Sequence, residues 1–354
     1  MLRRSAPVLG LLVLAPVCAE YLYGYDESTG NLSELLWGLL ILGPLYGGAA
    51  LLIREAARCS GRGWPTMLLL GLAFGVVQAG LVDHSMFNPS YRDIDFWDAI
   101  FAPTFVPVLG LSADLAVSFT IGHMIWSIGV PIAVIESLVP ARATSPWLGR
   151  FGTGLTVVAF GLAAWFVFDW HVTQEDFLPS GGQLLGAATV AGGLVVAAFR
   201  LGRRVPDQRV AVGHWHVGAV AFALLAAPLA VDIAVASAQG GLTGAGASPT
   251  APSFMSRWPG FAVHVALLAT LAWCVALWSA RAGWGPLHRL ALAGGALLAN
   301  VVTAFATEPI GDVSRTAKLA HNVVAVLFVV ALVAVAQRRL RTHAAAPQSV
   351  PAAR

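Results

Sequence analysis

Polar side chains inside long apolar stretches are the residues of this chain that could do chemistry. His123 lies near the middle of one such stretch, with Asp114 before it and Ser127 one helical turn after it. Where an apolar stretch crosses a lipid bilayer, a polar side chain is costly and often marks a ligand site or an ion path. We therefore predict a binding region that draws on Gln78, Asp83, His84, Asp114, His123 and Glu136.

Each of these residues also has a purely structural interpretation. The ends of membrane helices contact headgroups and water, which would account for the acids and histidines near a helix end. A neutral histidine that is hydrogen-bonded to a neighbouring Gln or Ser would account for His123. Glu136 lies near the end of its stretch, level with Arg54 and Arg58 of another, and this placement predicts a structural ion pair.

The sequence carries no pattern that would place a cofactor or a metal. It has no ATP-binding loop, no haem-binding motif and no dense set of metal ligands. Its three cysteines, Cys18, Cys59 and Cys274, are scattered, so they predict neither a disulfide framework nor a metal cluster. We expect no cofactor, no metal and no catalytic residue.

Long apolar stretches must position these side chains. About ten of them are long enough to cross the hydrocarbon core, which needs roughly 20 residues of helix. Backbone groups cannot stay unpaired in lipid, so each stretch is predicted to be a helix. The sequence thus predicts an all-α, polytopic integral membrane protein with about ten spans: 6–22, 35–53, 65–82, 111–138, 148–168, 182–200, 214–236, 259–279, 286–306 and 318–336.

The basic residues predict how these spans are oriented. When the gaps between spans are numbered alternately, 17 of the 21 Lys and Arg fall in one set, and the other set holds only Arg92, Arg257, Arg315 and Lys318. Basic loops stay on the cytoplasmic side, so both termini are predicted to be cytoplasmic. Arginine far outnumbers lysine, a bias typical of GC-rich bacteria, which indicates a bacterial inner membrane. Because the Arg residues are spread over many segments, we expect the bilayer and no nucleic acid as a partner.

The chain divides into four parts along the sequence. We expect a seven-helix membrane part at 1–236 that contains the polar site, and a flexible outer loop at 237–258 rich in Gly, Ser and Pro. A three-helix membrane part follows at 259–336, and a disordered basic tail at 337–354. The halves show no convincing self-similarity, so an inverted repeat stays open.

Three further segments carry expectations. Gly43 and Gly47 face Gly71 and Gly75 in a predicted close contact between the second and third spans. The outer segment 83–110 is too long for a hairpin turn and is expected to lie on or in the membrane interface. The first span has a second reading, in which residues 1–19 are a cleaved signal peptide.

One resemblance concerns the residues around His123. The run from Phe74 through Gln78 and Asp83, followed by Phe119-Thr-Ile-Gly-His123, is similar in layout to the CAAX-protease and bacteriocin-processing family of membrane proteins. The resemblance implies a glutamate that activates water and supporting histidines. Here Gln78 and Ala79 stand where the paired glutamates belong, and Asp83 stands where the arginine belongs. Since Gln cannot act as a general base, the resemblance implies a catalytically inactive copy.

A closer resemblance is to uncharacterised multi-pass membrane proteins of actinobacteria. It covers about residues 20–150 and implies no known activity. The residues that carry it are Pro44-Leu-Tyr-Gly, Leu52-Ile-Arg-Glu55, Ser85-Met-Phe-Asn-Pro89 and His123-Met-Ile-Trp-Ser127 with Glu136.

The sequence therefore favours a non-catalytic membrane protein that binds a small molecule, a peptide, a lipid or a partner near His123. One alternative is a secondary transporter of a small solute. Another is an active CAAX-protease-like hydrolase, which would need Asp83, Asp114 or Glu136 as its base in place of Gln78.

Overall fold

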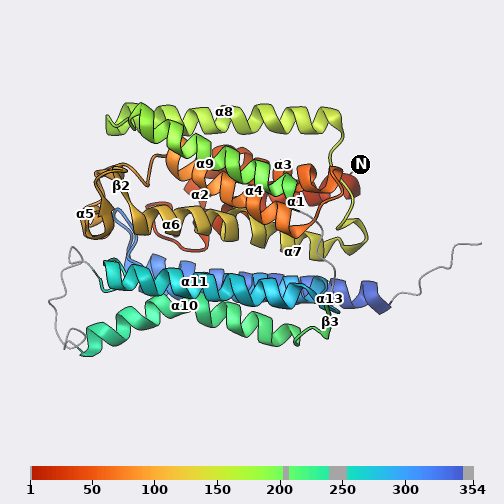
Figure 1. Cartoon of the computed structure of the whole chain (residues 1–354). Helices are drawn as coiled ribbons and strands as arrows, with labels where there is room; N and C mark the ends of the chain where they lie inside the picture. Colours follow the sequence, from red (N-terminus) through yellow and green to blue (C-terminus); the bar gives the residue numbers. More distant parts are fainter. Residues whose placement is uncertain (1, 202–206, 239–252, 346–354) are drawn as a thin grey trace, which may run out of the picture.

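Membrane-length helices make up nearly all of the structure. The computed structural model describes residues 2–201, 207–238 and 253–345 (Figure 1). Within these residues nine helices are long and apolar enough to cross a membrane, and a shorter apolar helix covers Ser5–Tyr21. The chain is thus an all-helical, multi-pass membrane protein, and its spans are Leu32–Cys59, Trp64–Val82, Ala113–Leu138, Arg150–Glu175, Gly181–Arg200, His214–Ala238, Trp258–Ser279, Pro286–Ala306 and Arg315–Ala345.

Several spans are composed of more than one helical segment. The segments in chain order are α1 (Leu2–Pro16), η1 (Val17–Tyr21), α2 (Leu32–Leu42), η2 (Gly43–Gly47), α3 (Gly48–Cys59), α4 (Trp64–Val77), η3 (Gln78–Val82), α6 (Ala113–Gly122), η6 (His123–Gly129), α7 (Val130–Leu138), α8 (Arg150–Glu175), α9 (Gly181–Arg200), α10 (His214–Ala238), α11 (Trp258–Ser279), α12 (Pro286–Thr303), η8 (Ala304–Ala306) and α13 (Arg315–Ala345). Short elements lie in the connections: η4 (Tyr91–Asp93), α5 (Trp97–Phe101), η5 (Ala102–Thr104), β1 (Phe105–Val106), β2 (Leu111–Ser112), η7 (Pro140–Arg142), β3 (Asp207–Val210) and β4 (Arg281–Ala282). Strand β1 pairs antiparallel with β2, and β3 pairs parallel with β4.

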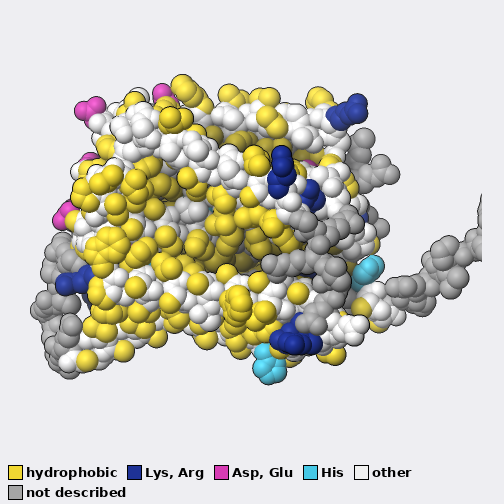
Figure 2. Space-filling model, in the orientation of Figure 1, with side chains coloured by type: hydrophobic (Ala, Val, Ile, Leu, Met, Phe, Trp, Pro, Cys, Tyr) yellow, Lys and Arg dark blue, Asp and Glu magenta, His cyan; other side chains and the backbone are white. Residues whose placement is uncertain are grey.

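The connecting loops gather at two opposite ends of the bundle. One end, here the Arg-rich end, holds 60–63, 139–149, 207–213 and 280–285, and both the start of α1 and the end of α13 lie there (Figure 1). The other, the acid-rich end, holds 22–31, 83–112, 176–180 and 307–314. Most of the Lys and Arg visible in Figure 2 lie at the first end and most of the visible Asp and Glu at the second, with hydrophobic side chains between them. The two alternate sets of gaps between spans, as numbered along the sequence, therefore lie at opposite ends of the bundle.

The helices form layers around a core that includes the first helix. Helices α8 and α9 cover one side, and α10 to α13 cover the other (Figure 1). Helix α12 packs against α7, α10 and α13, so α10 lies with the three C-terminal helices although the sequence groups it with the first seven. Leu11 and Leu14 of α1 are buried in the main core beside Ile132 of α7 and Leu297 of α12.

The glycines predicted to join the second and third spans pack against other helices, so that contact was wrong. A side chain at Gly47 would meet the backbone of Leu12 in α1, whose oxygen lies 2.8 Å from the added Cβ position. A side chain at Gly75 would meet the backbone of Thr120 in α6, whose Cα lies 2.8 Å away. Glycine spacing identifies a face that allows close approach, but it does not identify the neighbour on that face.

The ends of the predicted parts also differ from the structure. Helix α13 continues to Ala345, so residues 337–345 are helical where a disordered tail was expected. Residues 346–354 and 239–252 lie outside the described residues. The segment 83–110 is folded over the acid-rich end, where it buries Phe87, Trp97 and Phe101.

Candidate functional site

In the part of the chain that the structure describes, four helices widen into π turns, and each turn carries a polar residue. In each turn a backbone N–H bonds the oxygen five residues earlier, as in Leu22 N to Val17 O in η1 (3.0 Å) and Asp83 N to Gln78 O in η3 (2.9 Å). The turns η2 and η6 close in the same way. Such turns are rare and are frequent at functional sites. Their polar residues are Glu20 in η1, Tyr46 in η2, Gln78 in η3 and His123 in η6.

These turns bring their side chains into one region, which we call the π-turn site (Glu20, Tyr46, Gln78, Asp83 and His123). Turn η6 packs against η1, η2 and α4. Phe74, one turn before Gln78 in α4, contacts the rings of both Tyr46 and His123, so the end of α4 reaches the same region. Of the residues predicted from sequence, the structure therefore brings Gln78, Asp83 and His123 together.

The turn η3 sets the geometry of Gln78 and Asp83. Because the turn is one residue wider than an α-helical turn, side chains five residues apart lie on one face. The Gln78 amide nitrogen donates to Oδ2 of Asp83 (3.3 Å), and the backbone N–H of Ser85 donates to Oδ1 (2.9 Å). Gln78 is 1% exposed, and its Oε1 has no hydrogen-bond partner among the described residues.

His123 is enclosed by aromatic rings. Its imidazole stacks on Tyr46 with 5.6 Å between ring centroids, and it meets Phe74 in an edge-to-face arrangement with 5.8 Å between centroids. Phe119 stacks at 6.5 Å. Nδ1 pairs with the Ser127 hydroxyl at 3.0 Å, so the serine partner suggested by the sequence is present.

Glu20 belongs to the site although the sequence analysis did not select it. The Tyr25 hydroxyl donates to Oε2 of Glu20 (2.6 Å), and the Tyr46 hydroxyl lies beside the same carboxylate. Neither tyrosine was selected either. A glutamate near the end of an apolar stretch can indicate a functional site, because an acidic side chain in lipid is energetically costly. Position alone does not separate it from an acid that contacts water.

His84 lies next to Asp83 but packs in a different direction. Its ring and the ring of Phe168 are arranged edge to face with 5.2 Å between their centroids, and His84 is 1% exposed. Neither ring nitrogen has a hydrogen-bond partner among the described residues, and the backbone has a φ of 59°. A histidine in this left-handed region is uncommon and strained. Burial lowers the pKa of His84, against the opposing charge of Asp83.

A polar network supports this segment from α8. Asn88 donates to Oε2 of Glu175 (2.5 Å), while Oε1 of Glu175 pairs with Nδ1 of His171 (2.6 Å). Tyr91 stacks on His171 at 5.2 Å, and the Trp97 indole donates to the backbone oxygen of Asn88 (2.8 Å). The network fixes the chain where it leaves η3.

Asp114 and Glu136 lie outside the π-turn site. Asp114 pairs with Nδ1 of His264 at 3.3 Å and so joins α6 to α11 at the acid-rich end. Glu136 accepts from Arg58 at 2.7 Å and from Nε of Arg54 at 3.0 Å, which confirms the predicted ion pair. Both carboxylates thus have structural partners.

Arg54 forms the centre of a clamp at the Arg-rich end. It is fully buried, lies 3.4 Å over the Trp147 ring, and donates to Glu55 as well as to Glu136. It also donates to the backbone oxygen of Ala143 (2.8 Å). Glu55 in turn accepts from the backbone N–H of Trp147 (2.9 Å). The clamp therefore joins α3, α7 and the start of α8 with its charges paired.

Helix α13 holds the loop 22–31 over the acid-rich end. Nζ of Lys318 donates to the backbone oxygen of Tyr23 (2.9 Å). Nε2 of His321 pairs with the oxygen of Tyr21 (2.6 Å), and the N–H of Gly30 donates to Nδ1 (3.3 Å). Nδ1 accepts from Gly30, which leaves Nε2 as the donor to Tyr21. This loop carries Tyr25 to Glu20.

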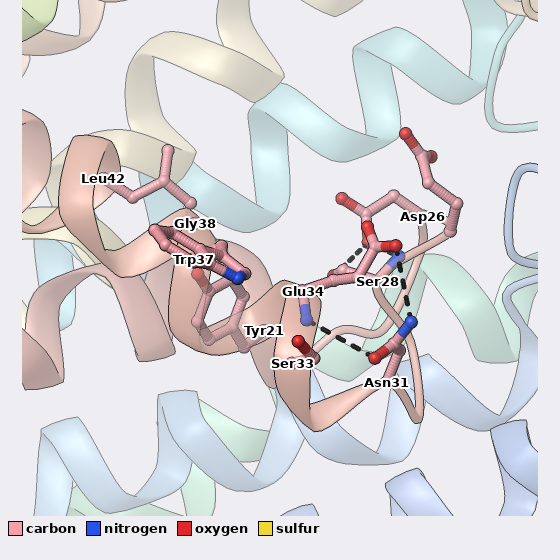
Figure 3. A pocket seen from close by; sticks show the side chains of 10 residues that line it. Tyr21, Asp26, Ser28, Asn31, Ser33, Glu34, Trp37, Gly38 and Leu42 are labelled. Atoms are coloured by element: carbon pink, nitrogen blue, oxygen red, sulfur yellow. Dashed lines mark hydrogen bonds between the residues drawn. The ribbon is translucent and has the colours of Figure 1, made fainter.

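A surface pocket of about 500 Å³ opens beside that loop (Figure 3). Acidic side chains from the loop and from α2 line it, together with the Trp37 and Tyr21 rings. Two hydrogen bonds order its rim, from the Asn31 amide to Glu34 and from Ser28 to Asp26. The full set of acids is Asp26, Glu27 and Glu34. Within the described residues, no group of three or more His, Cys, Asp and Glu side chains is arranged to hold a metal ion.

The comparisons with known proteins identify the family. Residues 9–268 match an uncharacterised membrane protein family, which is most of the chain and includes the whole π-turn site. The chain belongs to that family. Neither the curated proteins nor the solved structures gave a match. Helices α12 and α13, with Lys318 and His321, lie beyond the matched residues of this family member.

Proposed function

We propose that this protein is a non-catalytic, multi-pass protein of the bacterial inner membrane that binds a small polar ligand in the π-turn site. The observation that carries the proposal is that η6 packs against η1, η2 and α4, the helix that continues into η3, and that each of these four π turns carries a polar residue. Each turn leaves irregular backbone within or at the end of an apolar helix, which membrane proteins tolerate where it lines a site or is buried in protein.

The orientation is part of the proposal. The Arg-rich end would face the cytoplasm because basic loops resist translocation. The acid-rich end, with its pocket and the loop 22–31, would then face outward, and the ligand would reach the π-turn site from outside.

The test is chemical access to the site from outside. In a chain whose Cys18, Cys59 and Cys274 are replaced, Ser127→Cys should react with charged, membrane-impermeant methanethiosulfonates added to intact cells. Ser137→Cys is the matched control, since Ser127 and Ser137 are both buried in the same span and Ser137 lies nearer the Arg-rich end. An unreactive Ser127→Cys, or equal reaction at both positions, would contradict the proposal.

A second candidate is secondary transport, which one observation favours. Transporters bind solutes where membrane helices are interrupted, and here η2 and η6 interrupt two spans, while η3 ends a third span and η1 ends the shorter apolar helix. Reconstituted liposomes would decide between the two functions: net solute uptake indicates transport, whereas saturable binding without uptake indicates a binding protein.

Peptide cleavage is the remaining alternative from the CAAX-protease-like resemblance. We expect no cleavage by the purified protein, because Gln78 cannot accept a proton from water. A peptidase assay in liposomes tests this with His123→Ala and Asp83→Asn. Turnover that disappears in either variant would make this an active hydrolase.

A further inference from the structure

We propose that the ligand of the π-turn site is a small organic cation with N–H donors, such as a primary ammonium. This inference rests on the proposed function and adds the chemical class of the ligand. Three features of the described residues support it: unpaired acceptors in the site, aromatic rings around His123, and an acid-lined pocket beside the loop that carries Tyr25 to Glu20.

The site holds more acceptors than the protein supplies with donors. A carboxylate offers about four acceptor positions and an amide oxygen two. Asp83 receives two hydrogen bonds and Glu20 is approached by two tyrosine hydroxyls, while Oε1 of the buried Gln78 receives none. Neither carboxylate forms an ion pair within the described residues. A ligand with several N–H donors and a positive charge would satisfy these groups together.

The aromatic rings suit the rest of such a ligand. Tyr46, Phe74 and Phe119 surround His123 with centroid separations of 5.6 to 6.5 Å. Ring faces attract ammonium groups, and they also contact a short alkyl chain favourably. An anionic ligand would face two carboxylates and no described cation paired with them, which excludes that class by repulsion.

The pocket beside the loop 22–31 supplies an attractive approach. Asp26, Glu27 and Glu34 line it, and among the residues that the structure describes only Glu27 of these three forms an ion pair, with Arg92 at 3.1 Å. Tyr25, which donates to Glu20, is the residue next to Asp26 in this loop. A cleft lined by one sign of charge concentrates ligands of the opposite sign. The pocket and the site therefore favour the same class of ligand.

The experiment measures melting temperature in detergent with propylammonium chloride at constant ionic strength. A ligand that binds the folded state raises the melting temperature saturably. Propionamide is the neutral analogue, tetramethylammonium is a cation without N–H donors, and sodium chloride controls for salt. We expect a saturable rise with propylammonium, a smaller one with tetramethylammonium and none with propionamide.

The variants locate the effect. In Glu20→Gln and in Asp83→Asn, the propylammonium concentration that gives half of the rise in melting temperature should be at least tenfold higher than in the wild type. Asp114→Asn is the matched control and should retain it, since Asp114 is an acid of the same end that lies outside the site. Equal responses to propionamide, or full responses in both site variants, would overturn the proposal.

Labelling provides a second readout that does not depend on variants of the acids. Ser127→Cys should react faster with the trimethylammonium-ethyl methanethiosulfonate than with the sulfonato-ethyl one, relative to the exposed Leu178→Cys. Propylammonium should slow that reaction. If Ser127→Cys reacts equally fast with both reagents and propylammonium does not slow the reaction, the ligand is not a cation. The proposed polar binding site would still stand. An unreactive Ser127→Cys would remove both proposals.

Discussion

Gly75 is a residue whose missing side chain lets two helices meet. The backbone of Thr120 occupies the space where a Cβ would lie. We expect Gly75→Ala to lower the free energy of unfolding by about 1–3 kcal/mol, because backbone cannot move aside as a flexible side chain can. Thermal unfolding in detergent measures it. The control is Gly154→Ala in α8, where nothing lies within 4 Å of the added carbon; equal losses in both variants would contradict the contact.

His84 should make stability depend on pH. Its pKa is lowered in the folded protein, so protonation favours the unfolded chain. The contribution of a neutral His84 is complete above the unfolded pKa of about 6.5 and is lost as pH falls from there towards the folded pKa. Melting temperatures of wild type and His84→Asn should therefore diverge in slope below about pH 6.5. Asn tolerates the left-handed backbone. Parallel curves would show that His84 does not titrate in this way.

Residues differ in how far their partners and roles can be predicted from the sequence around them. The ion pair of Glu136 with Arg54 and Arg58 could be predicted from the sequence, because opposite charges at the same depth of a membrane tend to pair. Glu20 was missed because its depth near a helix end also fits contact with water. The partner of Gly75 was predicted wrongly, since helical spacing defines a face and the order of packing in the bundle defines the neighbour.

The loop 22–31 is an element held in place by another element, α13. Nδ1 of His321 accepts from Gly30 in this loop and Nε2 pairs with Tyr21 at its start, so His321→Phe should release the loop. His321→Gln keeps one donor and one acceptor and should retain it. The reporter is Thr29→Cys in a chain without other cysteines, because Thr29 is 4% exposed. Thiol labelling at Thr29→Cys should rise in the Phe variant alone, measured against the exposed Leu32→Cys. Unchanged labelling would show that Lys318 suffices.

Spans are predictable elements, whereas the turns inside them are not. The predicted span 65–82 and the observed Trp64–Val82 differ by one residue, since hydropathy and Trp64 mark the boundary. The π turns leave no comparable pattern: η2 contains Pro44, but η1 and η3 contain no proline. Their position depends on packing between helices, so the candidate site could be predicted only in part.

At the scale of the whole molecule, the two ends differ in charge and should face different compartments. Cys59 is exposed at the Arg-rich end, so it should react with an impermeant thiol reagent only after cells are opened. Leu178→Cys, in a chain without native cysteines, should react in intact cells. The reverse pattern would invert the topology and with it the side from which a ligand enters.

Each π turn has a consequence for how the length of this chain can change. A turn that spans five residues instead of four absorbs one extra residue while the helix on either side keeps the same face towards its neighbours. Loss of one residue elsewhere in an α-helix would rotate everything beyond it by about 100°. Single-codon deletions are therefore tolerated best at η2 and η6, where a helix continues on both sides of the turn. Such changes would alter the lining of the π-turn site while leaving the packing of the bundle and its hydropathy intact.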